Sequence, residues 1–204
     1  MAYYLFPNSI PAHDCEKYLE HCLDHVVFEN SNDINRGLVD CFSKNLYTHN
    51  PEITDDPKIR KTSVGYIDTK YDPLNSIIWG YIRHANKQFF KYDLSSFQPI
   101  QFSKYQDGGF YPWHQDVLRT TKIQNTRKLS LTLTLSDESS YDGGLFQFYN
   151  GGVNDSVNWI ALSEKIRKMG TVIVFDSRDW HRVTPVTKGV RYSIVCWTVG
   201  PNFV

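Results

Sequence analysis

The sequence lacks a long apolar run, and no stretch approaches the roughly 18 residues that a membrane-spanning helix needs. Its beginning, Met1 to Pro7, has neither a basic region nor a long apolar stretch, so we expect no secretory signal peptide there. Together the two absences predict a cytoplasmic protein with no membrane partner.

Net charge is also missing, because 22 Lys and Arg residues balance 22 Asp and Glu residues. Without a net field to attract phosphates, nucleic acid is not an expected partner. One local basic cluster is interpreted as a solvated loop, with a binding patch as the alternative; it comprises Arg119, Lys122, Arg127 and Lys128.

Cysteine is scarce, and the 4 cysteines include no CxxC pair. Cys15 and Cys22 are spaced so that both lie on one face of a helix, where we expect them to act as small apolar residues. Free thiols without an export signal fit a reducing cytosol.

The chain does have 204 residues, enough for one domain with a sizeable core, and 15% of them are aromatic. Its first half predicts two helices, one beginning near Ser9 and Pro11 and the other at Asp72. Each carries an apolar stripe at helical spacing, which we assign to the core without any chemistry.

From about residue 97 onward, short segments separated by Gly-rich turns replace the helical spacing. The predicted strands are 97–106, 110–116, 128–136, 144–149, 171–176 and 190–199. Many short strands after helices predict a mainly β (α+β) fold. We expect a double-stranded β-helix, or jelly roll, in residues 97–204, supported by residues 1–96 within a single domain, 1–204.

The predicted strand 128–136 alternates leucine with serine and threonine. Its leucine face belongs in a core. The hydroxyl face would meet solvent in an ordinary sheet, or would line the pocket if the jelly roll holds an interior site.

Two polar segments, 43–61 and 117–127, precede predicted strands. We expect them to be mobile without substrate and to order over it, because loops on a rigid scaffold commonly carry recognition. The alternative is that they are surface connections with no role.

Three residues have the chemistry and spacing of a metal site: His114, Asp116 and His181. On a strand, residues i and i+2 point to the same side, so His114 and Asp116 can reach one ion while Gln115 points away. His181 must then come from a neighbouring strand, about 4.8 Å away. Two imidazoles and one carboxylate on one face of a divalent metal suit non-haem Fe(II) oxygenases.

These residues belong to a longer pattern that comprises Tyr105, the run Tyr111-Pro112-Trp113-His114-Gln115-Asp116, the alternating segment 129–135, Tyr141-Asp142-Gly143-Gly144, and the segments 181–185 and 189–197. Over roughly residues 97–199 the sequence resembles the prolyl-hydroxylase-like branch of the Fe(II)/2-oxoglutarate dioxygenases. It is most similar to bacterial and phage-type members, which keep an arginine where collagen-type prolyl hydroxylases use lysine.

The resemblance implies Fe(II), 2-oxoglutarate as co-substrate, O2 and ascorbate as reductant. Arg191 would receive the distal carboxylate of 2-oxoglutarate, since a guanidinium matches a carboxylate in bidentate geometry. Tyr105 and Thr134 would be further donors to the co-substrate. An arginine on the surface after a turn is the alternative for Arg191.

Three further residues are candidates for the substrate pocket. Trp197 shares a strand face with Arg191, so it either walls the metal pocket, as the resemblance implies, or fills the core. Tyr111 poses the same choice. Arg178 would meet substrate or pair with Asp176 or Asp179.

The expected function is therefore hydroxylation of a C–H bond, that of a prolyl residue in a protein or peptide, with release of succinate and CO2. A second hypothesis keeps this chemistry and changes the substrate to a free amino acid, another small molecule or a nucleobase. A third is a non-oxygenase, cupin-like metal protein, for which Cys196 could be a further ligand. Succinate release separates the first two hypotheses from the third.

Overall fold

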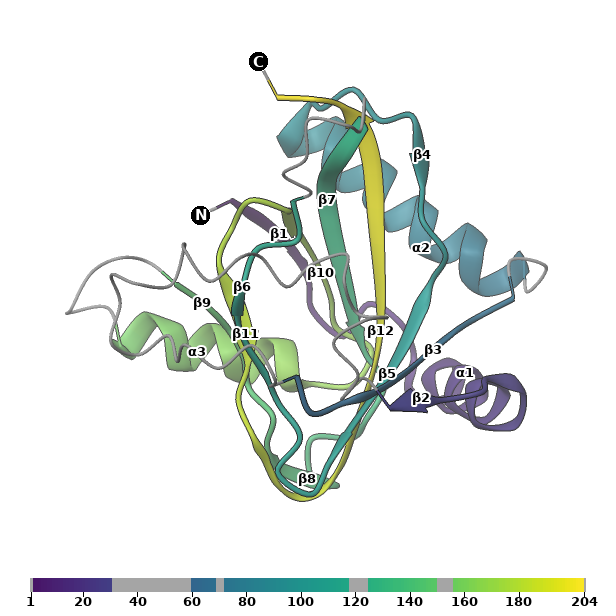
Figure 1. Cartoon of the computed structure of the whole chain (residues 1–204), viewed down its shortest axis with the longest axis vertical. Helices are drawn as coiled ribbons and strands as arrows, with labels where there is room; N and C mark the ends of the chain where they lie inside the picture. The colour runs from purple at the N-terminus through teal and green to yellow at the C-terminus, as the bar shows by residue number, and fades with distance from the viewer. Residues whose placement is uncertain (1, 31–59, 69–71, 118–124, 150–155, 204) are drawn as a thin grey trace.

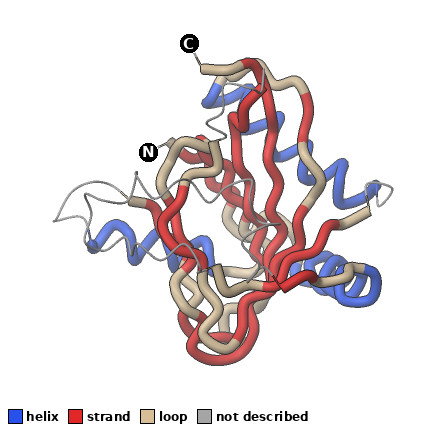
Figure 2. Tube along the Cα trace, in the orientation of Figure 1, coloured by secondary structure: helices blue, strands red, loops and turns tan. Residues whose placement is uncertain are grey.

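The computed structural model describes residues 2–30, 60–68, 72–117, 125–149 and 156–203 (Figure 1). Its strands form two layers, and the helices lie outside them (Figure 2). Within these residues no helix is long and apolar enough to cross a membrane.

The larger layer is an antiparallel sheet that is 9-stranded over the described residues. Its strands, in spatial order, are β1 (Tyr3–Phe6), β10 (Val172–Asp176), β7 (Asn125–Thr134), β12 (Val186–Pro201), β5 (Gln101–Gln106), β3 (Ser63–Tyr66) and β2 (Glu29–Asn30). Two short strands, β4 (Ser96–Phe97) and β8 (Tyr141–Gly143), pair with β12 off this path. Strands β7 and β12, the two longest, pair with each other in the middle of the sheet.

The smaller layer has the order β6 (Tyr111–His114), β11 (His181–Val183) and β9 (Phe146–Phe148). Both pairings are antiparallel. Two facing antiparallel sheets with helices outside confirm the mainly β, double-sheet fold that was predicted.

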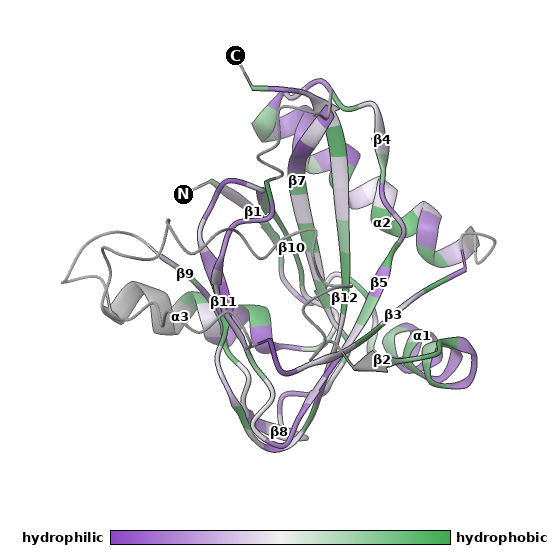
Figure 3. Cartoon of the chain, viewed as in Figure 1, coloured by the Kyte–Doolittle hydropathy of each residue, from purple (hydrophilic) through white to green (hydrophobic). Residues whose placement is uncertain are grey.

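Helices α1 (Ala12–His25) and α2 (Asp72–Ala85) pack their apolar stripes on the larger sheet, as predicted. A π-helical turn, η1 (Asn86–Phe90), continues α2. The core between helices and sheet contains Cys15, Cys22, Leu74, Ile78, Ile82, Leu129, Leu131, Leu133 and Leu135. Figure 3 shows green, hydrophobic bands alternating with paler and purple ones along β7 and α2.

Both faces of β7 are buried, although only one is apolar. Its leucines face the helices, whereas Ser130, Thr132 and Thr134 point the other way and are also buried. Ser130 donates to Asp116, and Thr132 lines a cavity between the sheets. The hydroxyl face of this strand therefore faces an interior site and not solvent.

Several elements were not predicted. Helix α3 (Ser156–Arg167) lies beside β9, and the short strands β1 and β8 pair within the larger sheet. Strands of three or four residues are too short to show a period, so their existence depends on the neighbours that pair with them. The predicted mobile segments fall largely outside the described residues, in 43–59 and 118–124.

Two members of the basic cluster contradict the solvated-loop interpretation. Arg127 and Lys128 lie on β7 and are buried. The Arg127 guanidinium is 3.9 Å from the centre of the Trp197 ring, and Lys128 Nζ is 3.6 Å from that of Phe203. Aromatic faces thus replace part of the water that each cation loses. The other two members, Arg119 and Lys122, lie outside the described residues.

Candidate active site

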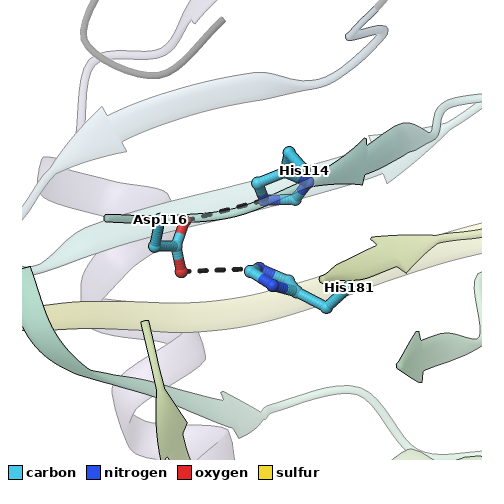
Figure 4. Close-up of side chains that lie close together, drawn as sticks. All are labelled: His114, Asp116 and His181. Carbon is cyan, nitrogen blue, oxygen red and sulfur yellow. Dashed lines mark ion pairs between the residues drawn. The ribbon is translucent and has the colours of Figure 1, made fainter. Parts of the chain in front are cut away.

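The pairing of β6 with β11 brings the two histidines together. His114 and His181 are register partners across the smaller sheet, and Asp116 follows just after β6 ends. Asp116 Oδ1 is 3.6 Å from His114 Nε2, and Asp116 Oδ2 is 3.4 Å from His181 Nε2 (Figure 4). The structure thus confirms that these three side chains converge, with the second histidine on a neighbouring strand.

A bulge in β6 directs the side chain of Tyr111 toward His114. His181 pairs with His114 and Val183 pairs with Tyr111, so β6 has one residue more than β11 in this interval. Pro112 lies in the bulge, where its missing N–H does no harm. The Tyr111 ring consequently stacks on that of His114, with 3.6 Å between ring centres.

Backbone carbonyls set the orientation of both imidazoles. His114 Nδ1 lies 2.8 Å from the carbonyl oxygen of Pro112, and His181 Nδ1 lies 2.9 Å from that of Asp179. A carbonyl oxygen only accepts, so each Nδ1 carries the proton and donates it. Each Nε2 is left with a lone pair for a metal.

The electrostatics keep the ligands in their metal-binding states. Burial, together with the charges of His181 and Arg60, lowers the pKa of His114 to about 3. Burial alone would raise the pKa of Asp116, but the neighbouring histidines, Arg127 and the Ser130 hydroxyl together lower it to about 2. At neutral pH the site therefore offers a neutral His114 imidazole and an ionised carboxylate, which are the states that metal ligation requires.

The three candidate ligand atoms all lie within 4.8 Å of one another. Within the described part of the chain this is the one group of three or more His, Cys, Asp or Glu side chains that could hold a metal ion. Cys196 belongs instead to the core cluster on the helical side of the larger sheet. Two imidazoles and one carboxylate are the ligand set of non-haem Fe(II) sites, whereas zinc sites often include a third histidine or a cysteine.

The cluster opens into a cavity of about 440 Å³, part of which is open to solvent. The cavity is lined by Arg60, Gln101, Tyr105, Tyr111, His114, Asp116, Leu131, Thr132, Phe146, Phe175, His181, Val183, Arg191, Ser193, Val195 and Trp197. Strand β12 alone supplies every second residue from Arg191 to Trp197, as side chains on one strand face should.

Arg191 is the buried cation of this cavity. Its side chain is 2% exposed, and its Nη1 donates to Ser193 Oγ at 3.1 Å. Its guanidinium also lies 5.5 Å from the centre of the Tyr105 ring. Among the residues that the structure describes, no carboxylate pairs with it. A buried guanidinium without a counter-charge fits a site for an anionic ligand such as 2-oxoglutarate.

The other predicted site residues divide into two groups. Tyr105, Tyr111 and Trp197 line the cavity. Thr134 does not, because its hydroxyl donates to the Ile166 carbonyl at 2.7 Å, so this geometry gives no support to its predicted role. Arg178 does not line it either.

Arg178 adopts the structural alternative. Its Nη2 lies 2.7 Å from Asp176 Oδ2 and its Nε donates to Asp176 Oδ1 at 3.0 Å. The Asp176 carboxylate therefore pairs with the Arg178 guanidinium outside the cavity lining.

Thr132 lines the cavity, as the alternative for the hydroxyl face of β7 expected. Sequence reasoning missed three other cavity residues with polar side chains: Arg60, Gln101 and Ser193. A period-two signal could have found Ser193, two residues after Arg191, and Gln101, four residues before Tyr105. No sequence signal marks Arg60, which precedes β3 and lines the cavity in the folded chain.

Comparisons with known proteins agree with this geometry. The family model described as "2OG-Fe(II) oxygenase superfamily" matches residues 100–199. Two similar curated proteins are a PKHD-type hydroxylase of Teredinibacter turnerae, 33% identical over 102 residues, and one of Pseudomonas putida, 37% identical over 104 residues. These alignments cover 48% and 49% of this chain. The chain spans less than half of the length of these relatives, 42% in each case.

Solved structures show the same fold. A viral collagen prolyl hydroxylase from Paramecium Bursaria Chlorella virus-1, in complex with 2OG, superposes with a TM-score of 0.63 at 18% identity, covering 98% of this chain and 97% of that one. A Pseudomonas putida prolyl-4-hydroxylase gives a TM-score of 0.61 at 18% identity, covering 96% and 91%. The segment 100–199, which matches the 2OG-Fe(II) oxygenase superfamily model, contains all three candidate metal ligands and Arg191.

Proposed function

We propose that this protein is an Fe(II)- and 2-oxoglutarate-dependent dioxygenase that hydroxylates a prolyl residue in a protein or peptide. One observation carries the proposal: His114, Asp116 and His181 converge in the same cavity as the buried Arg191 guanidinium, which has no carboxylate partner among the residues that the structure describes. We further propose that residues 1–204 act as one domain, because β1 and β3 are strands of the same sheet as β12.

The residues have distinct roles in this proposal. His114, Asp116 and His181 would hold Fe(II), and Arg191 would bind the distal carboxylate of 2-oxoglutarate. When bound, the metal and co-substrate supply the oxidising chemistry, in which O2 oxidises 2-oxoglutarate to succinate and CO2 and hydroxylates a C–H bond. The Ser193 hydroxyl accepts from Arg191, so its own proton remains for the co-substrate. Tyr105, beside Arg191, would be a second donor.

The walls of the cavity support an apolar reacting group. Tyr111 stacks on His114, and Trp197, Val183 and Val195 also line the cavity. A prolyl ring suits such walls, and its fixed φ lowers the entropy cost of binding an extended chain. A prolyl hydroxylase from Trichoplax adhaerens, solved in complex with a hypoxia inducible factor peptide fragment, has a similar fold, with a TM-score of 0.62 at 17% identity.

A second candidate substrate is a free amino acid or another small carboxylate. It is favoured by Arg60, a second guanidinium in the cavity lining, because arginine recognises carboxylates in bidentate geometry. A nucleobase substrate has less support, because the balanced charge of the chain provides no net field that attracts nucleic acid.

The test is aerobic incubation with Fe(II), 2-oxoglutarate and ascorbate, first with proline-containing peptides and then with free proline, free lysine and methylated oligonucleotides. We expect succinate and a peptide that gains the mass of one oxygen atom. Product from a free amino acid alone would overturn the prolyl assignment and leave the oxygenase standing. No succinate with any substrate, from protein shown to bind metal, would favour the cupin-like alternative.

A further inference from the structure

Asp116 is held by a chain of buried hydroxyl groups that the proposed roles do not use. Ser130 Oγ lies 2.7 Å from Asp116 Oδ2, and Ser177 Oγ lies 2.9 Å from Ser130 Oγ. Both serines are 0% exposed. Polar side chains that are fully buried are normally hydrogen-bonded.

The direction of both hydrogen bonds follows from the chemistry of the groups. An ionised carboxylate can only accept, so Ser130 donates its single hydroxyl proton to Asp116. Ser130 then has no proton left for Ser177. Ser177 must therefore be the donor in the second bond, and the chain runs from Ser177 to Ser130 to Asp116.

The three residues come from three separate parts of the fold. Ser130 is on β7 of the larger sheet, Asp116 follows β6 of the smaller sheet, and Ser177 begins the turn between β10 and β11. Backbone bonds fix Ser177: its N–H donates to the Lys128 carbonyl at 3.1 Å, and its carbonyl accepts from the N–H groups of Asp116 and Val117, each at 2.9 Å. The hydroxyl chain thus ties the metal-ligating carboxylate to both layers.

We propose that Ser130 and Ser177 are positioning residues that orient Asp116 for the metal, which rests on the function proposed above. The donor from Ser130 engages Oδ2 and stops the carboxylate from rotating, so that one oxygen is presented to the ion. A carboxylate that binds through one oxygen leaves more of the coordination sphere for co-substrate and O2. Loss of an outer hydrogen bond of this kind typically weakens metal affinity by roughly tenfold to a hundredfold.

The experiment uses the full chain, freed of metal and titrated anaerobically with Fe(II) and, in parallel, with Mn(II). Ser130→Ala should weaken metal binding roughly tenfold to a hundredfold, the range for loss of an outer-shell partner. Ser177→Ala removes the second bond only, so its effect should be smaller, roughly threefold to tenfold. Ser130→Thr keeps a hydroxyl on a β-strand and should restore most of the affinity.

The matched control is Ser163→Ala. Ser163 is also buried and donates one hydrogen bond, to the Phe146 carbonyl at 2.9 Å. Its loss should lower thermal stability about as much as Ser130→Ala does and leave metal affinity unchanged. A general loss of packing would instead weaken metal binding in both variants.

A second readout reports the coordination itself. Water proton relaxation by bound Mn(II) counts exchangeable water ligands, and Ser130→Ala should show fewer of them than the wild-type protein if the freed carboxylate binds through both oxygens. Wild-type affinity together with an unchanged water count in Ser130→Ala would overturn the positioning role. Failure of the wild-type chain to bind either metal any better than His114→Ala would instead overturn the proposed function.

Discussion

Arg191 is the residue on which co-substrate binding should depend most. Removing it would leave a desolvated carboxylate unpaired, a penalty of roughly 3–5 kcal/mol for a buried pair. We therefore expect Arg191→Ala to weaken 2-oxoglutarate binding by about a hundredfold to several thousandfold. Arg191→Lys should be intermediate, since the charge remains and the bidentate fork is lost. Calorimetric titration of 2-oxoglutarate into the Mn(II)-loaded protein measures both.

Arg178→Ala provides the control for that series. It removes a guanidinium that pairs with Asp176 outside the cavity lining, so co-substrate affinity should be unchanged. Equal affinities for 2-oxoglutarate in wild type and Arg191→Ala would contradict the assignment of the anion site.

The three metal ligands predict a second series at the residue scale. Alanine at His114, Asp116 or His181 should abolish metal binding and turnover while the fold survives, because two remaining ligands do not hold Fe(II) on one face. Metal titration with circular dichroism on the same samples checks both parts. Gln115→Ala lies between two ligands in the sequence and should bind metal normally; normal iron binding by all three alanine variants would refute the site.

The depressed pKa of His114 predicts how the metal-free protein responds to acid. Its ordinary value is 6.5 and its value in the folded chain is about 3, so between these pH values the unfolded state binds one proton more. The free energy of unfolding should therefore fall as pH drops from about 6.5 toward 3, by at most about 1.4 kcal/mol per pH unit from this group. Urea unfolding across this range, with a chelator present, measures the slope, and His114→Gln should flatten it.

At the scale of elements, the contact between the β8–β9 turn and β12 shapes the anion site. Gly144 has φ +60°, and a Cβ there would lie 3.0 Å from Arg191 Cδ and 2.8 Å from Val186 Cγ2. The glycine is therefore needed for both the left-handed backbone and the closeness of the arginine stem.

Gly144→Ala should lower stability by roughly 1–2 kcal/mol through its backbone conformation. We also expect it to weaken 2-oxoglutarate binding severalfold by displacing Arg191. The matched substitution Gly80→Ala lies on the exposed side of α2 with nothing within 4 Å, and should stabilise the protein by roughly 0.5–1 kcal/mol. Thermal unfolding and co-substrate titration of both variants distinguish a local effect on Arg191 from a general one; unaltered binding in Gly144→Ala would speak against it.

At the scale of the whole molecule, ligands that bind only the folded state should stabilise it. The metal site joins β6, Asp116 just after it and β11, and Arg191 lies on the central strand β12, so both ligands depend on the complete double sheet. With each ligand at about a hundred times its Kd, the free energy of unfolding should rise by about 2.7 kcal/mol per ligand. Melting curves with Mn(II), with 2-oxoglutarate and with both measure this, and His114→Ala should lose the response to metal.

Much of this protein could be predicted from its sequence, because the relevant signals are local. The i and i+2 spacing of His114 and Asp116 needs only the geometry of a strand. The two-residue alternation of strand β7 and the helical stripes of α1 and α2 are likewise periodicities of neighbouring residues. The pair His114 and Asp116, the double-sheet fold and the two amphipathic helices follow from these patterns, whereas His181 was singled out by the family resemblance of the segments around it.

Other features were decided only by tertiary structure, because they depend on what lies opposite a residue. Thr134 and Thr132 occupy the same face of β7, yet the end of α3 offers Thr134 a carbonyl while Thr132 meets the cavity. Arg127 is charged and nevertheless buried, because its guanidinium packs on the Trp197 ring and its Nε donates to Gln98 Oε1. The sequence by itself determined which side chains share one face of a strand or helix. The packing of the two sheets determined which of these faces contact each other, because contacts between distant segments produce no periodic pattern in the sequence.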